Sequence, residues 1–464
     1  MLHSDGLPPP ERRRAMLVII LAIIVAVLDG TIVNLALPSI ARDLQAPAAH
    51  AIWVVNAYQV ALLALLLPCA TLGDLIGYRR VYLIGMAVFT AASLACTMAN
   101  SLTTLALARG IQGLGAAGLM SVNTALVRLI YPRALLGRGV ALNSLVVATA
   151  SVAGPSAAAA VLSVADWPWL FAINLPLGAV VLALGPRALP DNASPPSAGA
   201  RLSPVDVGLN AAMFALVVMG ADALGVSAAG ARADLARGSL LLAAGVAVGI
   251  FYVLRQRRLA VPLLPVDLLR IPLFRLSMCS SVCAFSAQML SFVSLPFLML
   301  DALGRGTGQT GLLMSCWPLA TVVAAPLAGR LIGRVSDGLL GGIGMGCMTA
   351  GLLALTWMPE HPSNLDIAWR LAMCGFGFGL FQSPNNHTIV SSAPPQRSGG
   401  ASGMLSTARL TGQTLGVVLL AGVFSVFNAH NGHGPMVGLV MAACFSGAAA
   451  VFSSLRTRHR LAEH

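Results

Sequence analysis

The stretch Ala15-Met-Leu-Val-Ile-Ile-Leu-Ala-Ile-Ile-Val-Ala-Val-Leu-Asp-Gly-Thr-Ile-Val-Asn-Leu-Ala-Leu37 decides the fold class of this chain. An α-helix rises about 1.5 Å per residue, so about 20 apolar residues cross the roughly 30 Å hydrocarbon core of a bilayer. The run follows three arginines at positions 12–14, as the core of a signal peptide would. However, it is too long for one, it contains Asp29, and further apolar runs follow it. We therefore expect an uncleaved first membrane helix.

The composition of the whole chain supports the same class. Of its 464 residues, 57% are hydrophobic and 9% are charged, whereas a soluble domain carries about 25% charged residues. The mean hydropathy is +0.83. These values exclude a soluble enzyme, a nucleic-acid binder and a disordered chain, even though the net charge is +12. The chain is expected to be an integral membrane protein with the lipid bilayer around it.

The basic and sulfur-containing residues argue against several kinds of catalytic site. All 28 basic residues are arginine, so no lysine is present to bind nucleotide phosphates in a P-loop or to form a Schiff base. The eight cysteines fall within apolar segments, as small core residues do. We therefore expect no cofactor, no metal site and no enzymatic activity.

Outward from the first run, the chain contains about fourteen apolar segments of spanning length, separated by charged and turn-forming residues. The expected spans cover residues 15–37, 51–71, 81–99, 103–126, 139–162, 169–186, 205–225, 238–254, 273–299, 310–332, 339–358, 367–390, 402–427 and 435–455. The sequence thus predicts an all-α polytopic membrane protein with 14 transmembrane helices.

The arginines give the orientation of these spans. With the N-terminus on the cytoplasmic side, 21 arginines, including Arg456, fall on cytoplasmic connections or tails. Four fall on the opposite side and three lie within spans or at their ends. Cytoplasmic loops of membrane proteins are enriched in arginine and lysine. We therefore expect both termini in the cytoplasm. The glycosylation sequons at Asn192 and Asn386 fall on a cytoplasmic loop and inside a span, and no transit peptide is recognisable, so a bacterial inner membrane is the expected location.

Two connections differ from the short loops elsewhere, because they are rich in proline or charge. They divide the chain into six, two and six spans, as in transporters built from repeated bundles. A similar cytoplasmic corner follows the second span of each six, at Ala70–Arg80 and Gly329–Arg334. The expected parts are a cytoplasmic N-terminus at 1–14, an N-terminal six-helix bundle at 15–186, a cytoplasmic linker at 187–204, two additional central helices at 205–254, a second linker at 255–272, a C-terminal six-helix bundle at 273–455 and a cytoplasmic C-terminus at 456–464.

Two charged residues lie within apolar helices at a similar depth. Asp29 is about 21 Å into an inside-to-outside helix, and Arg109 enters from the outside by about six residues. Both therefore lie about 9–10 Å from the outer edge. A lone charge in a membrane costs several kcal/mol, so the two residues are expected to pair. The pair could be a static structural contact, but a titratable acid whose arginine partner can be separated from it is suited to proton coupling.

Other polar and aromatic residues interrupt apolar helices and could line a cavity for an amphipathic ligand, which needs apolar walls and a few orienting polar groups. Core packing is the alternative for each aromatic residue. The glycine pairs 342/346, 375/379 and 412/416 predict close helix packing. The proline of Gly154-Pro155 allows a kink in the fifth span. The cavity candidates are Asn56, Gln59, Gln112, Gln288, Trp317, Phe381, Gln382, Asn385 and Arg409.

Several segments together resemble the major facilitator superfamily, and within it the fourteen-span drug:proton antiporters. The order of these segments along the chain is more specific than any one of them. They are Leu28–Pro38, Leu72–Arg80, Arg109–Gly118, Gly154–Pro155, Trp167–Pro176, Gly375–Asn386 and Thr407–Gly412.

The resemblance implies roles for particular residues. Asp29 would be the coupling or substrate-sensing acid, with Arg109 linked to proton transfer. Asp74, Gly77, Arg79 and Arg80 would form a cytoplasmic latch between the two halves. Gly154 and Pro155 would belong to the hinge motif associated with antiport.

The resemblance also implies a major facilitator fold and a proton-coupled secondary transporter. Such a protein exports amphipathic, cationic or neutral drug-like compounds by alternating access, so its partners are a small-molecule substrate and protons. The main alternative is the same fold carrying a specific metabolite, such as an amino acid, a sugar or a siderophore. A non-transporting membrane sensor or an intramembrane enzyme is a third possibility. The sequence does not decide whether a periplasmic adaptor takes part.

Overall fold

The computed structural model of the chain describes residues 6–132, 135–191, 203–227, 232–257, 266–332, 334–359, 361–392, 398–429 and 431–462. Within these ranges the chain is all-α, and extended pairing is limited to one isolated bridge between Ile332 and Val335. Much of the two predicted linkers at 187–204 and 255–272 lies outside the described residues.

Sixteen α-helices follow one another along the described chain, and two of them, α2 and α7, are short. Their bounds are α1 Pro9–Asp43, α2 Ala48–Ala51, α3 Trp53–Ile76, α4 Tyr78–Thr97, α5 Leu102–Ile130, α6 Leu136–Leu162, α7 Pro168–Ala172, α8 Asn174–Ala188, α9 Pro204–Ser227, α10 Arg232–Gln256, α11 Pro272–Pro296, α12 Thr307–Leu331, α13 Asp337–Thr356, α14 Asn364–Ser392, α15 Ser398–Val426 and α16 His433–Ala462. A 3-10 turn, η2 (Val266–Arg270), precedes α11, and a π-helical turn, η3 (Phe297–Ala302), follows it.

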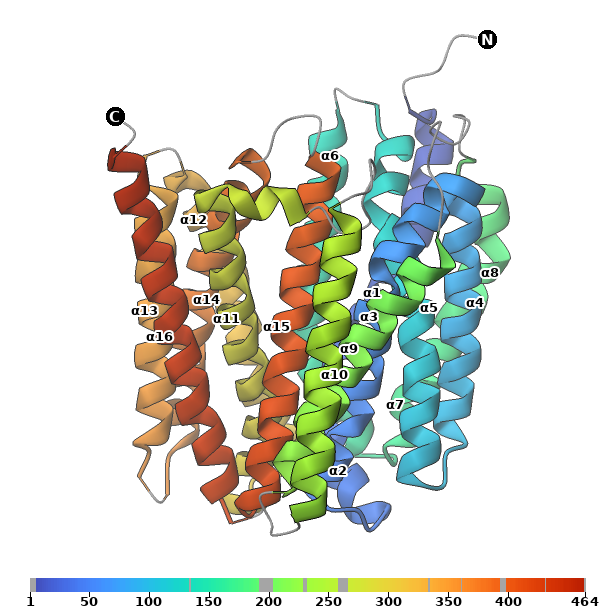
Figure 1. Ribbon diagram of the computed structural model, residues 1–464. Helices are drawn as coiled ribbons and strands as arrows, with labels where there is room; N and C mark the ends of the chain where they lie inside the picture. Colours follow the sequence, from blue (N-terminus) through green and yellow to red (C-terminus); the bar gives the residue numbers. More distant parts are fainter. Residues whose placement is uncertain are drawn as a thin grey trace.

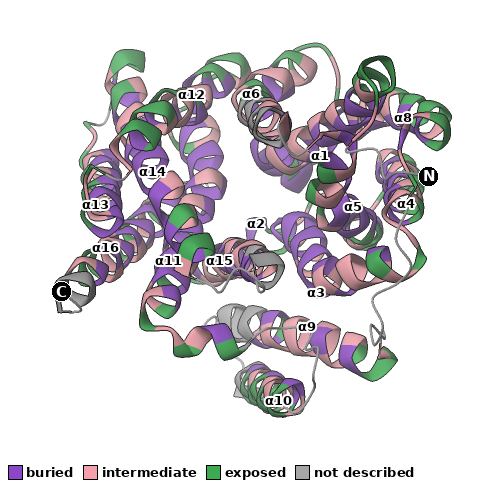
Figure 2. Ribbon diagram, turned by 90° about the horizontal axis from the view of Figure 1, so that it is seen from above, coloured by how far each residue is buried: buried purple, intermediate pink, exposed green. Residues whose placement is uncertain are grey.

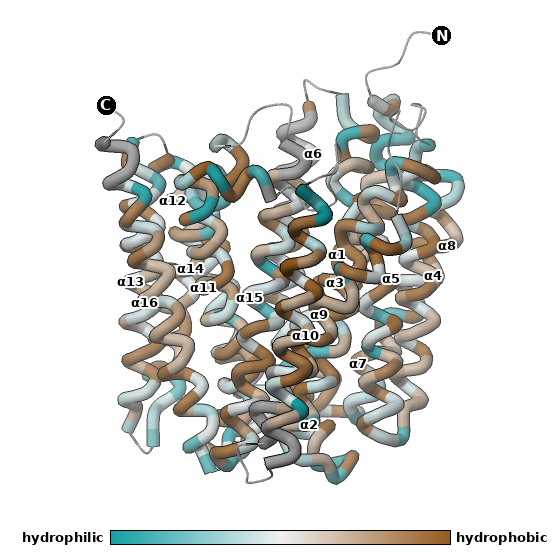
Figure 3. Tube along the Cα trace, in the orientation of Figure 1, coloured by the Kyte–Doolittle hydropathy of each residue, from teal (hydrophilic) through white to brown (hydrophobic). Residues whose placement is uncertain are grey.

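The long helices run side by side, and the beginning of α1 lies at the same end of the molecule as the end of α16 (Figure 1). We call this end the termini end and the opposite one the far end. The middle of most helices is hydrophobic, whereas hydrophilic residues gather toward the ends (Figure 3). In the described residues, 11 helices are long and apolar enough to cross a membrane. The predicted all-α membrane fold is confirmed, and the number of 14 spans stays a prediction.

The helices form two groups with α9 and α10 beside them (Figure 2). We call α1, α3–α6 and α8 the N-terminal bundle and α11–α16 the C-terminal bundle. Helix α6 packs along α12 across the interface, and α15 packs against both α3 and α9. The two additional helices are central in the chain but peripheral in space. Helix α9 contacts one helix of each bundle.

Five of the six glycines in the three predicted pairs lie at close contacts between helices, as expected. A Cβ at Gly375 would lie 2.0 Å from the Trp317 carbonyl oxygen, and one at Gly412 would lie 2.5 Å from that of Val282. Gly379, Gly416 and Gly342 are similarly close to neighbouring helices. Small residues let helix backbones approach this closely. Gly346 is the exception, because its missing side chain would meet open space.

The largest apolar cluster that joins the two bundles lies toward the far end. It combines Leu37 and Ile40 of α1 with Met289 and Leu295 of α11. We call it the shared cluster. Two polar contacts accompany it, between Arg42 and Asp301 at 3.6 Å and between the hydroxyls of Ser156 and Ser315 at 2.8 Å.

Toward the termini end the apolar clusters lie mostly within one bundle or the other. One lies around Ile19 and Met86 in the N-terminal bundle, together with Leu410 of α15. Two smaller ones lie around Phe274 and Leu340 in the C-terminal bundle. The interface between the bundles is therefore packed shut at the far end and far less joined at the termini end.

Candidate functional site

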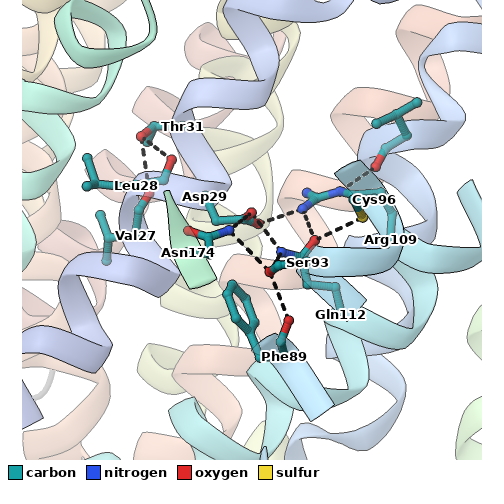
Figure 4. Close-up of polar contacts among 11 residues, drawn as sticks. Val27, Leu28, Asp29, Thr31, Phe89, Ser93, Cys96, Arg109, Gln112 and Asn174 are labelled. Carbon is teal, nitrogen blue, oxygen red and sulfur yellow. Dashed lines mark hydrogen bonds and ion pairs between the residues drawn. The ribbon is translucent and has the colours of Figure 1, made fainter. Parts of the chain in front are cut away.

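Asp29 of α1 and Arg109 of α5 form an ion pair inside the N-terminal bundle (Figure 4). The arginine Nη1 lies 2.5 Å from the Asp29 Oδ2, and the two side chains are 0% and 1% exposed. Their equal depth in antiparallel spans predicted this pairing, and the structure confirms it. A pair this deeply buried loses most of its hydration, so each charge depends on the other and on its hydrogen bonds.

Three further side chains complete the polar network around Asp29. Gln112 and Asn174 each donate a hydrogen bond to Asp29 Oδ1, at 2.8 and 2.9 Å. Both amides also donate to the hydroxyl of Ser93 on α4, at 2.8 and 3.3 Å. The carboxylate is thus held by residues of α5 and α8 as well as by its ionic partner. All five side chains are buried.

Arg109 is fixed by contacts of three kinds besides the ion pair. Its Nε donates to the Val54 carbonyl of α3 at 3.0 Å, and its Nη1 donates to the Gln112 Oε1 at 2.5 Å. Its guanidinium lies 4.3 Å from the centre of the Tyr58 ring and 5.6 Å from that of Phe171. A cation over an aromatic face is attracted by the negative face of the ring. Arg109 therefore links α1, α3 and α5 through one side chain.

Among the described residues that form the network, Asp29 carries the one carboxylate. Protonation of this group would therefore change the charge of the whole network. Protonation of Asp29 would turn a neutral ion pair into a buried site with a net positive charge. The hydrogen bonds that favour the carboxylate would then be lost or rearranged. Such a site can report the presence of a proton to the helices that build it.

Gly154 and Pro155 of α6 lie where α6 meets both α1 and α12. A Cβ at Gly154 would be 2.1 Å from the Thr31 Oγ1, two residues after Asp29 on α1. A Cβ built at Gly311 of α12 would lie 2.6 Å from the carbonyl oxygen of Pro155. The Gly-Pro pair therefore sits between the polar network and the interface with the C-terminal bundle.

The residues expected to form a latch make their described contacts within the N-terminal half. The Tyr78 hydroxyl donates to Asp74 at 2.5 Å, and Arg79 pairs with Asp191 at 2.8 Å, just after α8. Gly77 has a φ of 107° between α3 and α4, a conformation that other residues rarely adopt. Arg80 is exposed. Among the described residues, no ion pair of these four reaches the C-terminal bundle.

The nine cavity candidates fall into different environments. Gln112 belongs to the Asp29 network, and Asn385 donates to Ser281 at 2.7 Å within the C-terminal bundle. Phe381 is buried beside Phe378, while Gln288 and Gln382 are half-buried. Four candidates have buried polar atoms with no hydrogen-bond partner: Asn56, Gln59, Trp317 and Arg409. Orphaned polar atoms of this kind call for a bound molecule or water as partner.

The structure shows that Arg456 is a buried residue of α16. The sequence pattern assigned this residue to the cytoplasmic tail after residue 455, but α16 continues to Ala462 and Arg456 is 2% exposed. Its Nη1 donates to the Asn385 Oδ1 at 2.7 Å and to the Ser277 hydroxyl at 3.0 Å. Sorting arginines into cytoplasmic and outer connections uses only their position relative to the apolar runs. It does not show whether the side chain points into the protein or into water.

A second missed cluster lies at the termini end of the C-terminal bundle. His387 Nδ1 is 2.8 Å from Asp337 Oδ2, to which the Thr388 hydroxyl also donates at 3.0 Å.

In the N-terminal bundle, the sequence did not predict Ser93, Asn174 or Tyr58 as residues of the polar site around Asp29 and Arg109. Asn174 carried a weak signal, because it is an amide within an apolar span, whereas Ser93 carried none.

Comparison with known proteins places this architecture in a family. The sequence pattern of the Major Facilitator Superfamily matches residues 19–417. The chain is 53% identical over 455 residues to "Uncharacterized transporter YebQ" of Escherichia coli (strain K12), covering 98% of each chain. It is 30% identical over 409 residues to "Multidrug resistance protein Stp" of Mycobacterium tuberculosis (strain ATCC 25618 / H37Rv), covering 87% of this chain and 74% of Stp.

A solved structure shares the fold. A bacterial homologue of the human lysosomal transporter Spinster, in an inward-facing and unoccupied conformation, matches with a TM-score of 0.68 and 14% identity. The match covers 97% of this chain and 98% of that one. The long helices, the two bundles and the sequence relatives agree. The chain is therefore a membrane transporter of the Major Facilitator Superfamily and not an enzyme.

Proposed function

We propose that this transporter exports amphipathic, drug-like compounds in exchange for protons. The observation that carries the proposal is the fully buried pair of Asp29 and Arg109, because an ionisable pair inside a membrane helix bundle is costly and marks functional sites. The 30% identity to a protein named for multidrug resistance supports drugs as the cargo.

The distribution of arginines supports a cytoplasmic termini end. With that orientation, the shared cluster and the Arg42–Asp301 contact close the outer side, and the inner side is the open one. The described state is then inward-facing, ready to accept cargo from the cytoplasm or the inner leaflet. Alternating access follows if the bundles rock about their interface, so that the shared cluster separates while the inner ends come together.

Proton and cargo are coupled through Asp29. In the inward-facing state the carboxylate is charged, paired and favourable for cargo loading. In the outward-facing state a proton from outside neutralises Asp29, weakens its hold on Arg109 and favours cargo release. The coupling can be no larger than the difference in cargo affinity between the two protonation states. The Gly154–Thr31 contact provides a direct route from the network to α6 and the interface.

The test is transport by the purified protein in lipid vesicles. An imposed acid step should drive movement of at least one amphipathic dye, a protonophore should abolish it, and protons should move in the opposite direction. Dyes, amino acids, sugars and a siderophore are measured in parallel. If only a metabolite moves, drug export is wrong and the chain is a metabolite carrier. If nothing moves in response to the acid step, proton coupling is wrong as well.

A further inference from the structure

Arg409 lies where both bundles meet. Its helix, α15, stands between α11 and α3 (Figure 2). The next residue, Leu410, belongs to the apolar cluster of the N-terminal bundle, whereas a Cβ at Gly412 would lie 3.0 Å from the Phe285 Cβ of α11. Arg409 itself is half-buried, with its guanidinium 5.7 Å from the centre of the Phe285 ring. It is therefore on the interface at which a rocking transporter binds its cargo.

No counter-ion accompanies this arginine in the described part of the chain. Its Nε is buried and has no hydrogen-bond partner, and the ion pairs of the described residues do not include it. The buried arginines of the described chain each have an ionic or hydrogen-bonding partner: Arg109 has Asp29, Arg370 has Asp366, and Arg456 has Asn385 and two serines. Leaving a buried N–H donor of an arginine without a partner is unfavourable. A group absent from the chain itself is the natural partner.

The surrounding charges do not compensate Arg409. Tyr58 of α3 lies within electrostatic reach of both Arg409 and Arg109, but Arg109 is already balanced by Asp29. This part of the interface therefore carries the uncompensated positive charge of Arg409. On the same helix, the Asn56 Nδ2 donor and the Asn56 Oδ1 and Gln59 Oε1 acceptors have no hydrogen-bond partner among the described residues. These amides can orient a polar group of either kind, whereas the charge of Arg409 favours an anion and disfavours a cation.

We infer that Arg409 binds the negatively charged group of the cargo, and that the cargo is an amphipathic organic acid bearing a carboxylate, sulfonate or phosphate. The apolar part of such a molecule lies against Phe285. Arginine suits this role because its fork of N–H donors matches a planar or tetrahedral anion and stays charged at any relevant pH. The inference rests on the proposed export function and replaces the cationic or neutral cargo expected from the sequence. It also gives the half-buried Arg409 the partner that the described chain does not supply.

Two dyes with nearly the same apolar body give a direct test. 8-Anilinonaphthalene-1-sulfonate carries a sulfonate, and N-phenyl-1-naphthylamine lacks it. Binding of each is measured by fluorescence to the full chain in phosphatidylcholine nanodiscs, with empty nanodiscs subtracted. The wild-type protein should bind the sulfonate about tenfold more tightly than the neutral dye, the discrimination expected of a charged hydrogen bond. Arg409→Gln should remove the preference and leave neutral-dye binding intact, while Arg409→Lys should keep part of it.

The matched control is Arg305→Gln, which removes an arginine from an outer connection where it bonds Asn364, and this variant should keep the wild-type preference. A preference that persists in folded Arg409→Gln, or a wild-type protein that prefers the neutral dye, would overturn the inference. Repeating the measurement in nanodiscs that contain phosphatidylglycerol distinguishes a cargo site at Arg409 from a site for an anionic lipid headgroup. If that lipid abolishes the sulfonate preference, Arg409 is a lipid-headgroup site and the inference about cargo is wrong.

The dye measurement is made without a proton gradient, so it is independent of the transport assay. Transport of dyes without any charge preference would refute the role of Arg409 and leave the export function standing. A sulfonate preference that depends on Arg409, in a protein that moves nothing after an acid step, would refute proton-coupled export instead.

Discussion

The side-chain amide of Asn210 on α9 donates a hydrogen bond of 2.7 Å to the carbonyl oxygen of Ala64 on α3. This carbonyl is four residues before Pro68, which lies inside α3 and has no N–H to complete the helical bond. An asparagine from an additional helix thus satisfies an acceptor that the proline leaves open. Asn210 is 1% exposed, so no water replaces it readily.

This relationship predicts a double-mutant cycle. Asn210→Leu should lower the free energy of unfolding by about 1–3 kcal/mol, because it leaves a buried carbonyl without a donor. In a Pro68→Ala background the new backbone N–H can bond to Ala64, so Asn210→Leu should cost less there. The thermal unfolding midpoints of the four proteins in detergent measure this. Equal losses in both backgrounds would show that Asn210 acts independently of the proline.

The proton-coupling role of Asp29 predicts a specific loss in Asp29→Asn. The asparagine keeps the size of the side chain but cannot ionise, so acid-driven dye movement in vesicles should fall to the level of empty vesicles. Dye binding should also lose its dependence on pH. The protein should still insert and purify as a folded monodisperse species. Asp166→Asn, which changes an exposed carboxylate before α7, is the matched control and should transport normally. Acid-driven transport by Asp29→Asn would remove Asp29 from the mechanism.

The buried ion pair predicts strong non-additivity. Arg109→Gln leaves the Asp29 carboxylate buried without its partner and should cost about 3–5 kcal/mol of stability. The double variant Asp29→Asn/Arg109→Gln removes both charges and should be more stable than Arg109→Gln alone. The same cycle on Asp366 and Arg370, a pair one turn apart with exposures of 26% and 11%, should give a much smaller coupling, because water screens the two charges. Equal couplings in the two cycles would contradict the role of burial.

The close approach of α6 to α1 predicts that Gly154→Ala is harmful. The added methyl would meet Thr31 at 2.1 Å, and such overpacking costs about 1–3 kcal/mol. Transport should fall together with stability, because α6 also contacts α12 across the interface. Thr31→Ala should recover part of the loss by removing the Oγ1. Gly346→Ala faces open space and should leave both thermal stability and dye transport unchanged. A wild-type midpoint for Gly154→Ala would contradict the packing argument.

The fold and the central ion pair followed from simple properties of the sequence. Apolar run length predicts membrane helices, because the bilayer imposes one thickness on all of them. Depth along two antiparallel helices predicted the pairing of Asp29 and Arg109, because both residues are costly when alone. Neither argument needs knowledge of which helices are neighbours, and both were confirmed by the structure.

The remaining contacts depend on helix rotation and neighbourhood, which the sequence does not reveal. Ser93 is an ordinary small residue in its own span, and only the packing of α4 beside α5 brings it to Gln112. The burial of Arg456 was not predicted, because the end of an apolar run does not show how far its helix continues or what the next turn packs against. Trp317 and Phe381 were equally compatible with a cavity or a core, since an aromatic side chain suits both.

The shared cluster at the far end has a consequence for the thermodynamics of the transport cycle. Separating the bundles at the far end must expose apolar side chains such as Leu37, Met289 and Leu295 to water. Hydration of apolar surface raises heat capacity. The conformational step that opens the far end should therefore have a curved Eyring plot. The equilibrium between the closed and open far end should pass through a temperature at which the closed form is most stable.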